Sequence, residues 1–231
     1  MMQFEHHRKV QEIAKWVHSQ LEQFITSDSS EASIAKKATD LLADCGVTET
    51  WYYDVPAFVL LGSRSCLSVS GKNYVPSTEP VGSFNLVTVD LSPIIGEAWG
   101  DCARSYVVEE GIVTHNPSRT DFAEGLVIEK RLHMEMIEFA EPSTRFSDLF
   151  EYSNSRIAQY GYENIDFLLN LGHSIEVRPS ERRFIDKNCH ELLGSVSFFT
   201  FEPHIRKAGG KWGFKHEDIY YFNDEGHAVA L

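Results

Sequence analysis

The stretch that decides the fold runs from VTVDLS at residues 87–92 to WGDCAR at residues 99–104. Each piece places an aspartate, Asp90 or Asp101, among apolar and β-branched residues that are typical of a strand. Eleven positions separate the two aspartates, and Gly96 between them favours a turn that brings the chain back. The pattern therefore predicts two strands that each carry an aspartate.

Three further polar residues follow the same pattern later in the chain: His173 in LGHSI, Glu202 in FTFEP and Glu217 in KHEDIY. Acidic side chains are rare in apolar strands, because burying an unpaired carboxylate carries a large free-energy penalty. Five such positions that converge in space would be explained by bound metal. The residues alone also allow a second interpretation, in which they are unrelated surface acids and one packed histidine.

Composition limits the classes of function. A chain of 231 residues can bury a good core as one domain, or as two small halves fused without a linker. A net charge of −13 argues against a nucleic-acid-binding surface, which would be basic. Two divalent cations would neutralise the four carboxylates named above, so the surface is expected to be less acidic than the sum suggests.

The cysteines and the apolar segments indicate the compartment. Cys45, Cys66, Cys102 and Cys189 show no paired spacing, which favours reduced thiols in the cytoplasm. The longest apolar run, residues 57–61, is too short to span a bilayer, and the N-terminus lacks an apolar signal core. We therefore expect a cytoplasmic protein with no membrane contact.

Helical spacing of apolar residues predicts a first helix over residues 4–26. A second helix is expected to begin after Asp28, because Glu31 three residues later fits a capping box, and to end before Gly46.

A second pair of helices follows a block of strands. Strands are expected over residues 50–70 and 84–108, and Thr120 and Thr144 are expected to cap the two later helices. The rest of the chain returns to strands and turns. This order favours an α+β domain with helices on one face of an antiparallel sheet. It also hints at two related halves, although no residue-level repeat is visible.

The motifs VDL, GDxxR, GHxI, FEP and ED resemble those of the pita-bread metallopeptidases, in the family order Asp, Asp, His, Glu, Glu. That family includes methionine aminopeptidases, Xaa-Pro aminopeptidases, prolidases and the metal-free creatinase. The resemblance covers residues 5–231 and implies one pita-bread catalytic domain over residues 1–231, with two pseudo-related halves.

The resemblance also implies a dinuclear metal centre. Asp101 and Glu217 would bridge two divalent ions, Asp90 would bind one of them, and His173 with Glu202 would bind the other. Such ions can share a hydroxide and polarise a carbonyl, with Glu202 taking the proton of the attacking water. Four carboxylates and one imidazole suit Mn, Fe or Co, with Zn possible. The implied activity is hydrolysis of a small peptide or amide, most like an Xaa-Pro peptidase or aminopeptidase.

Two departures from the family pattern concern substrate binding. The active peptidases carry a histidine shortly before the first aspartate strand and another shortly after the ligand histidine. The corresponding segments here, residues 67–76 and 176–183, contain none. Two alternatives to a peptidase therefore stay open. One is a metal-dependent enzyme that acts on a small non-peptide substrate. The other is a non-catalytic binding protein, against which five retained metal-binding residues argue.

Several nearby residues are candidates for substrate contact. His204 could replace a missing histidine as a catalytic residue, and a packed histidine fits equally well. Strand alternation points His216 away from Glu217, so a packed role is favoured. Arg104 is expected to pair with a ligand carboxylate, and Cys102 to lie in the core.

The remaining candidates are arginines and aromatic residues. Arg178, Arg182 and Arg183 could bind a substrate carboxylate, but a solvated loop is the favoured interpretation. Aromatic residues near strands are mostly core, although some of these could line a pocket: Trp51, Tyr52, Tyr53, Trp99, Trp212 and Phe214.

Overall fold

The protein, described here by a computed structural model covering residues 2–231 with side chains from residue 4 onward, has two helices, then strands, twice over. The helices are α1 (Met2–Phe24), α2 (Glu31–Asp44), α3 (Thr120–Phe139) and α4 (Phe146–Gln159). The strands of the first half are β1 (Glu49–Thr50), β2 (Ala57–Leu61), β3 (Phe84–Leu91), β4 (Pro93–Ile95), β5 (Ala98–Trp99), β6 (Cys102–Glu109) and β7 (Ile112–Thr114). Those of the second are β8 (Tyr162–Asn164), β9 (Phe199–Phe201), β10 (His204–Lys207), β11 (Gly213–Lys215), β12 (Asp218–Phe222) and β13 (Ala228–Ala230).

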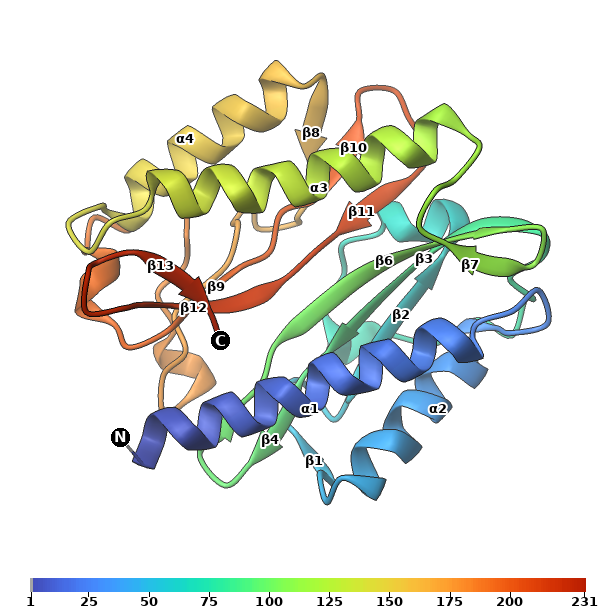
Figure 1. Ribbon diagram of the computed structural model, residues 1–231, viewed down its shortest axis with the longest axis horizontal. Helices are drawn as coiled ribbons and strands as arrows, with labels where there is room; N and C mark the ends of the chain where they lie inside the picture. Colours follow the sequence, from blue (N-terminus) through green and yellow to red (C-terminus); the bar gives the residue numbers. More distant parts are fainter. Residues whose placement is uncertain (1) are drawn as a thin grey trace.

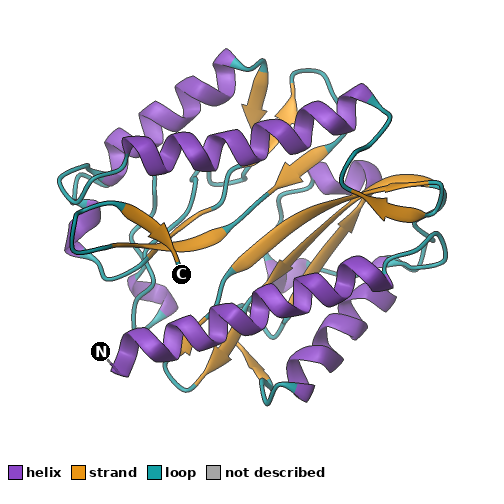
Figure 2. Ribbon diagram, in the orientation of Figure 1, coloured by secondary structure: helices purple, strands orange, loops and turns teal. Residues whose placement is uncertain are grey.

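The strands form antiparallel sheets, which confirms the predicted α+β class. One sheet has the order β2-β3-β6-β7, and three smaller sheets have the orders β1-β4-β5, β11-β10-β8 and β13-β12-β9. In Figure 1 the strands β3, β6, β9, β11 and β12 lie between the pair α1 and α2 and the pair α3 and α4, whereas β1 lies below α1 and β8 above α3. Figure 2 shows the same arrangement by secondary structure. Across residues 2–231, none of the helices combines the length and apolar character of a membrane span.

Each half of the molecule has its own apolar core. In the first half, α1 and α2 pack on β2, β3 and β6 around residues such as Leu21, Ile34 and Val89. In the second half, α3 and α4 pack on the later strands around residues such as Phe146 and Phe201. The amphipathic stripes seen in the sequence supply the helical side of both cores.

A buried histidine–tyrosine contact occurs once in each half. On α1, Nδ1 of His18 lies 2.7 Å from the Tyr106 hydroxyl, and on α3, Nδ1 of His133 lies 2.7 Å from the Tyr220 hydroxyl. In both cases Nε2 binds the backbone carbonyl of the residue four positions before the tyrosine. The sequence separations of 88 and 87 residues are nearly equal. This repeat supports two related halves, and no continuous sequence similarity reveals it.

The predicted caps differ from those observed. The N-cap of α2 is Ser30, which exchanges side-chain hydrogen bonds with Ser33, so the expected capping box of Asp28 and Glu31 is wrong. Helix α3 begins at Thr120 itself without a side-chain cap. For α4, no side chain caps the helix either. Thr144 instead accepts a hydrogen bond from the amide of Glu141, because its hydroxyl closes the preceding turn.

Glu31 is fully buried and binds a neighbouring loop instead of its own helix end. Its carboxylate accepts from the Leu61 amide at 2.8 Å, the Ser77 amide at 2.7 Å and Nε of Arg64 at 2.8 Å. Glu31→Ala would leave two backbone donors without their partner, so we expect it to lower the free energy of unfolding by about 2–4 kcal/mol. Urea denaturation measures this. Asp40→Ala, at an exposed position of α2, is the control, and a loss equal to that of the control would contradict the prediction.

Glu129 on α3 is a buried acid whose Oε2 has no hydrogen-bond partner among the described residues. Burial raises its pKa to about 8. Its protonated form therefore contributes stability below the ordinary pKa near 4.5, and that contribution is lost as the pH rises through 8. We expect Glu129→Gln to be more stable than wild type by about 4–5 kcal/mol at pH 8.5, and by less than about 1 kcal/mol at pH 5. Denaturation at both pH values tests this, with the exposed Glu138→Gln on the same helix as control; a difference independent of pH would contradict it.

Candidate functional site

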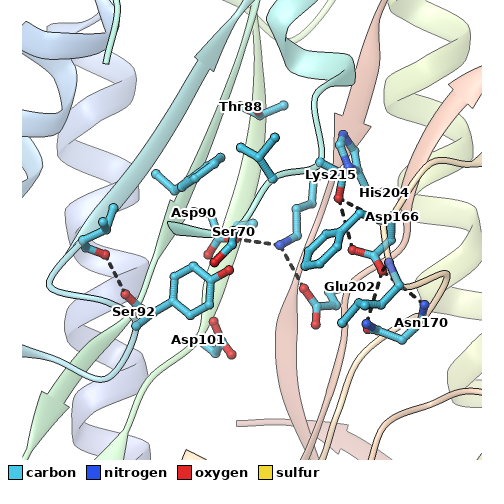
Figure 3. Close-up of a pocket in the computed structure, with 18 of the residues that line it drawn as sticks. Ser70, Thr88, Asp90, Ser92, Asp101, Asp166, Asn170, Glu202, His204 and Lys215 are labelled. Carbon is cyan, nitrogen blue, oxygen red and sulfur yellow. Dashed lines mark hydrogen bonds and ion pairs between the residues drawn. The ribbon is translucent and has the colours of Figure 1, made fainter. Parts of the chain in front are cut away.

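A cavity of about 210 Å³ lies where the two halves meet, and it is lined by most of the predicted site residues. From the first half, Asp90 projects from β3 and Asp101 from the turn between β5 and β6. From the second half come His173, which precedes β9, and Glu202, which follows it. Figure 3 shows the carboxylates facing one another across this cavity.

Glu217 joins this group through the contact between the two sheets. It precedes β12 and pairs with Ala103 of β6, with a hydrogen bond of 3.0 Å from the Glu217 amide to the Ala103 carbonyl. Ala103 also pairs with Asp90 of β3. Three adjacent strands thereby bring residues from both halves of the sequence to one place.

Three of the five predicted residues form a compact group, which we call the acid–histidine cluster: Asp101, His173 and Glu217. One potential ligand atom from each lies within 4.8 Å of the others, and all three side chains are buried. Nε2 of His173 lies 3.4 Å from Oδ2 of Asp101 and 3.8 Å from Oε1 of Glu202.

The histidine ring is oriented for binding a cation. Nδ1 of His173 lies 3.0 Å from the Ser174 carbonyl, which can only accept, so Nδ1 carries the proton. The lone pair of Nε2 is then directed at the acids, an arrangement common in metal-bound histidines. Oδ2 of Asp101 and both carboxylate oxygens of Glu217 have no hydrogen-bond partner among the described residues. These buried acceptors require a cation or a proton.

The electrostatics of the cluster lead to the same requirement. Burial raises the pKa of Asp101 to about 6. Burial, and then the nearby Asp101 and Glu202 carboxylates, raises the pKa of Glu217 well above its ordinary value. A divalent ion would reverse these shifts, because it favours the charged form of each carboxylate. Carboxylate oxygens with one imidazole nitrogen are donors that suit such an ion, so the residues present fit a metal site.

Lys215 is a site residue that the sequence analysis missed. Its Nζ lies 2.6 Å from Oδ2 of Asp90 and 2.9 Å from Oε2 of Glu202 (Figure 3). It also lies 3.5 Å from Oε2 of Glu217. Burial opposes its charge, but these three carboxylates raise the pKa of Lys215 well above its ordinary value, so it is an ammonium group. Asp90 is therefore paired with a lysine and lies outside the acid–histidine cluster. Strand alternation was the available signal, because residues 215 and 217 share a face.

The two histidine candidates differ in their surroundings. His204 on β10 lines the cavity, and its Nε2 donates to the Ser65 carbonyl at 2.7 Å. Burial lowers the pKa of His204 to about 4, so the ring is neutral near pH 7. His216 does not line the cavity; it packs against His133 and lies 3.1 Å from Oδ2 of Asp218. The predicted packed role of His216 is confirmed.

Arg104 pairs with a neighbour of the predicted ligand. Its guanidinium binds both carboxylate oxygens of Asp218 at 2.9 and 3.0 Å and donates to the Glu217 carbonyl at 2.6 Å. The expected ion pair with a ligand carboxylate is therefore wrong, because Asp218 and Glu217 point to opposite faces of the strand. Cys102 is completely buried, as predicted.

Aromatic residues form one wall of the cavity. Trp51, Tyr52 and Tyr53 all line it, with the Trp51 ring 5.7 Å from the ring of His173. By contrast, Trp99 and Phe214 are fully buried in the core. The pocket-lining interpretation therefore holds for the first group only.

Arg182 also lines the cavity, which corrects its expected place in a solvated loop. Its guanidinium lies 5.0 Å from the ring centre of Trp51 and 5.3 Å from that of Phe184. Stacking between two rings holds the charge at the wall of the cavity. Arg178 and Arg183 instead form ion pairs with glutamates.

Antiparallel sheets covered by two helix pairs, with a cavity between the halves, are the architecture of the pita-bread proteins. The sequence model of metallopeptidase family M24 matches residues 5–224, and the chain belongs to that family.

Individual relatives are distant. The chain is 25% identical to a methionine aminopeptidase of Chlamydia trachomatis over 143 residues, which is 61% of this chain and 46% of that protein. It thus spans about half the length of the curated relatives that it matches.

Three solved structures share its fold. The X-Pro aminopeptidase of Thermotoga maritima has a TM-score of 0.81 at 18% identity, over 99% of this chain and 60% of that one. The prolidase of Pyrococcus furiosus has a TM-score of 0.81 at 23% identity, over 99% of this chain and 63% of that one. The methionine aminopeptidase of Thermotoga maritima has a TM-score of 0.79 at 14% identity, over 99% of this chain and 96% of that one. At these identities the likeness concerns the fold alone.

Proposed function

We propose that this protein is a metal-dependent hydrolase of peptide or amide bonds and that the acid–histidine cluster is its metal site. The observation that carries the proposal is the set of buried carboxylate oxygens on Asp101 and Glu217 that lack partners and surround Nε2 of His173. Mn, Fe or Co is the expected metal, because the donors are mainly oxygen. Such an ion, when bound, would polarise the scissile carbonyl and lower the pKa of a water molecule.

Glu202 is the proposed general base. Burial acts to raise its pKa, but the ammonium of Lys215 outweighs that effect and holds the pKa of Glu202 below its ordinary value. The side chain is therefore a carboxylate at neutral pH and can accept a proton. Its Oε1 lies 3.8 Å from Nε2 of His173, at the edge of the metal site, and it lines the cavity. A proton taken from water there would be next to the substrate.

The cavity favours a small substrate. A volume of about 210 Å³ suits a dipeptide or a small amide, and Trp51 and Tyr52 offer apolar contact. Arg182 and Lys215 supply positive charge, and His204 is the candidate for a further contact to the substrate. Because related folds include an X-Pro aminopeptidase and a prolidase, we propose an Xaa-Pro dipeptide as the first substrate class to test.

A second candidate is hydrolysis of a small non-peptide substrate on the same scaffold. It is favoured by one observation: arginine and lysine line the cavity, whereas residues 67–76 and 176–183 contain no histidine. A binding protein without catalysis has less support, because it would have no need for a buried, cation-requiring cluster.

Metal analysis together with a substrate panel tests the proposal. Protein purified and dialysed against Mn²⁺ is expected to retain the ion, and Glu217→Gln to lose it, with the exposed Glu225→Gln as control. The wild-type protein with bound Mn²⁺ is then assayed with Xaa-Pro dipeptides, Met-initiated peptides and simple amides. Turnover of any of these supports a hydrolase. Protein that holds no metal with any divalent ion tested would contradict the proposal.

A further inference from the structure

The acids of the site divide into two groups with different partners. In one group, the acid–histidine cluster, Asp101 and Glu217 present oxygens with no hydrogen-bond partner. In the other group, Asp90 and Glu202 hold the ammonium of Lys215 at 2.6 and 2.9 Å. The second group already has a cation from the chain itself. The first group still requires one, because Nζ of Lys215 comes no nearer to Oε2 of Glu217 than 3.5 Å and makes no hydrogen bond to it.

The position of Lys215 is fixed by the strands around it. On β11 it pairs with His204 of β10. Its amide donates to Oγ of Ser105 at 2.9 Å, and the Ser105 hydroxyl donates to the Lys215 carbonyl at 3.1 Å. The backbone is therefore held on both sides, and the side chain, only 19% exposed, reaches down into the site.

Removing the ammonium from this place would be costly. Asp90, whose side chain is only 25% exposed, would lose its 2.6 Å partner, and a largely buried carboxylate without a partner carries a penalty. In the two-ion arrangement expected from the sequence, the ion bound by Asp90 would be bridged by Asp101 and Glu217. That ion would lie beside Nζ of Lys215, which is 2.6 Å from Oδ2 of Asp90 and 3.5 Å from Oε2 of Glu217, and it would meet the positive charge of the lysine. Four carboxylates and one ammonium leave a net charge of −3, which one divalent ion reduces to −1 and two ions would make positive.

We propose that Lys215 takes the place of one of the two metal ions expected from the sequence, so that the site binds a single divalent ion through Asp101, His173 and Glu217. This inference rests on the proposed function, because it concerns the same site. It changes the mechanism: the second positive charge beside the substrate comes from a lysine that cannot be removed by chelation. The protein is thus a hydrolase with one exchangeable metal.

The test counts Mn²⁺ per chain by isothermal titration and by equilibrium dialysis with elemental analysis. Wild type is expected to bind one ion and to give the electron paramagnetic resonance spectrum of an isolated Mn²⁺. Lys215→Met, which removes the charge and keeps the apolar stem, is expected to bind two ions with a spin-coupled spectrum. Lys211→Met, at an exposed position four residues earlier, is the matched control and should bind one. Lys215→Arg keeps the charge and should also bind one.

The outcomes separate this inference from the proposed function. Two ions bound to wild type would overturn the inference and leave the hydrolase proposal standing. No ion bound to wild type would overturn the proposed function itself. One ion bound to both wild type and folded Lys215→Met would show that Lys215 does not exclude the second ion, which also overturns the inference. If Lys215→Met fails to fold, the wild-type count and spectrum alone decide.

Discussion

Glu202→Gln is expected to lower turnover by a factor of about 10²–10⁴ in whichever substrate of the panel is cleaved, while Mn²⁺ remains bound. The amide has nearly the same shape as the carboxylate and keeps an oxygen for the site, but it cannot accept the proton of an attacking water. The loss should appear in kcat more than in KM, because the substitution removes the proton acceptor of the chemical step and leaves the contacts that bind the substrate.

The control for this prediction is a glutamate outside the cavity. Glu163→Gln on β8 removes an ion pair with Arg206 and should leave turnover unchanged. Both variants are compared with wild type for Mn²⁺ content and melting temperature. Undiminished turnover in Glu202→Gln with normal metal content would show that another group is the base.

Gly172→Ala is expected to disrupt the site from the backbone. Gly172 has a φ of +139°, and a Cβ there would collide with the carbonyl oxygen of Thr200. The adjacent His173 is held by a hydrogen bond of 2.7 Å from the Thr200 amide to its carbonyl. Alanine would push these two segments apart, and we expect a loss of about 3 kcal/mol or more in unfolding free energy together with weaker Mn²⁺ binding.

Gly96→Ala provides the comparison for backbone strain alone. Gly96 also has positive φ, +62°, but no atom lies within 4 Å of the added Cβ. It should cost about 1 kcal/mol and leave Mn²⁺ affinity unchanged, because Gly96 does not line the cavity. Urea denaturation and Mn²⁺ titration of both variants distinguish the two effects. Equal losses in both would contradict the role given to the contact between Gly172 and Thr200.

The α+β class could be predicted from sequence, and so could the position of the five candidate site residues in or beside strands, because each depends on a local pattern. Asp90 and Asp101 stand in short apolar segments, and helical stripes mark α1 and α3. The exact partner of each residue could not be predicted, since it depends on strands far apart in the chain. Asp90 is the example: its segment indicates a buried acid, but only the packing of β11 against β3 pairs it with Lys215.

Two local predictions failed for the same physical reason. Glu31 has the spacing of a capping residue, yet its carboxylate binds Arg64 and two distant backbone amides instead of the end of its own helix. Arg182 stands in a run of charged residues typical of a solvated loop, yet Trp51 and Phe184 provide a place for it. In both cases a tertiary contact overrides a sequence pattern. The repeated His18–Tyr106 and His133–Tyr220 contacts were hidden because nearly 90 residues separate the partners.

Anomalous diffraction from a crystal grown with Mn²⁺ tests the central claim most directly. The account predicts an anomalous peak within bonding distance of Nε2 of His173 and of the carboxylates of Asp101 and Glu217. Peaks confined to other parts of the molecule, or none despite Mn²⁺ in the crystal solution, would contradict the claim that this cluster is the metal site.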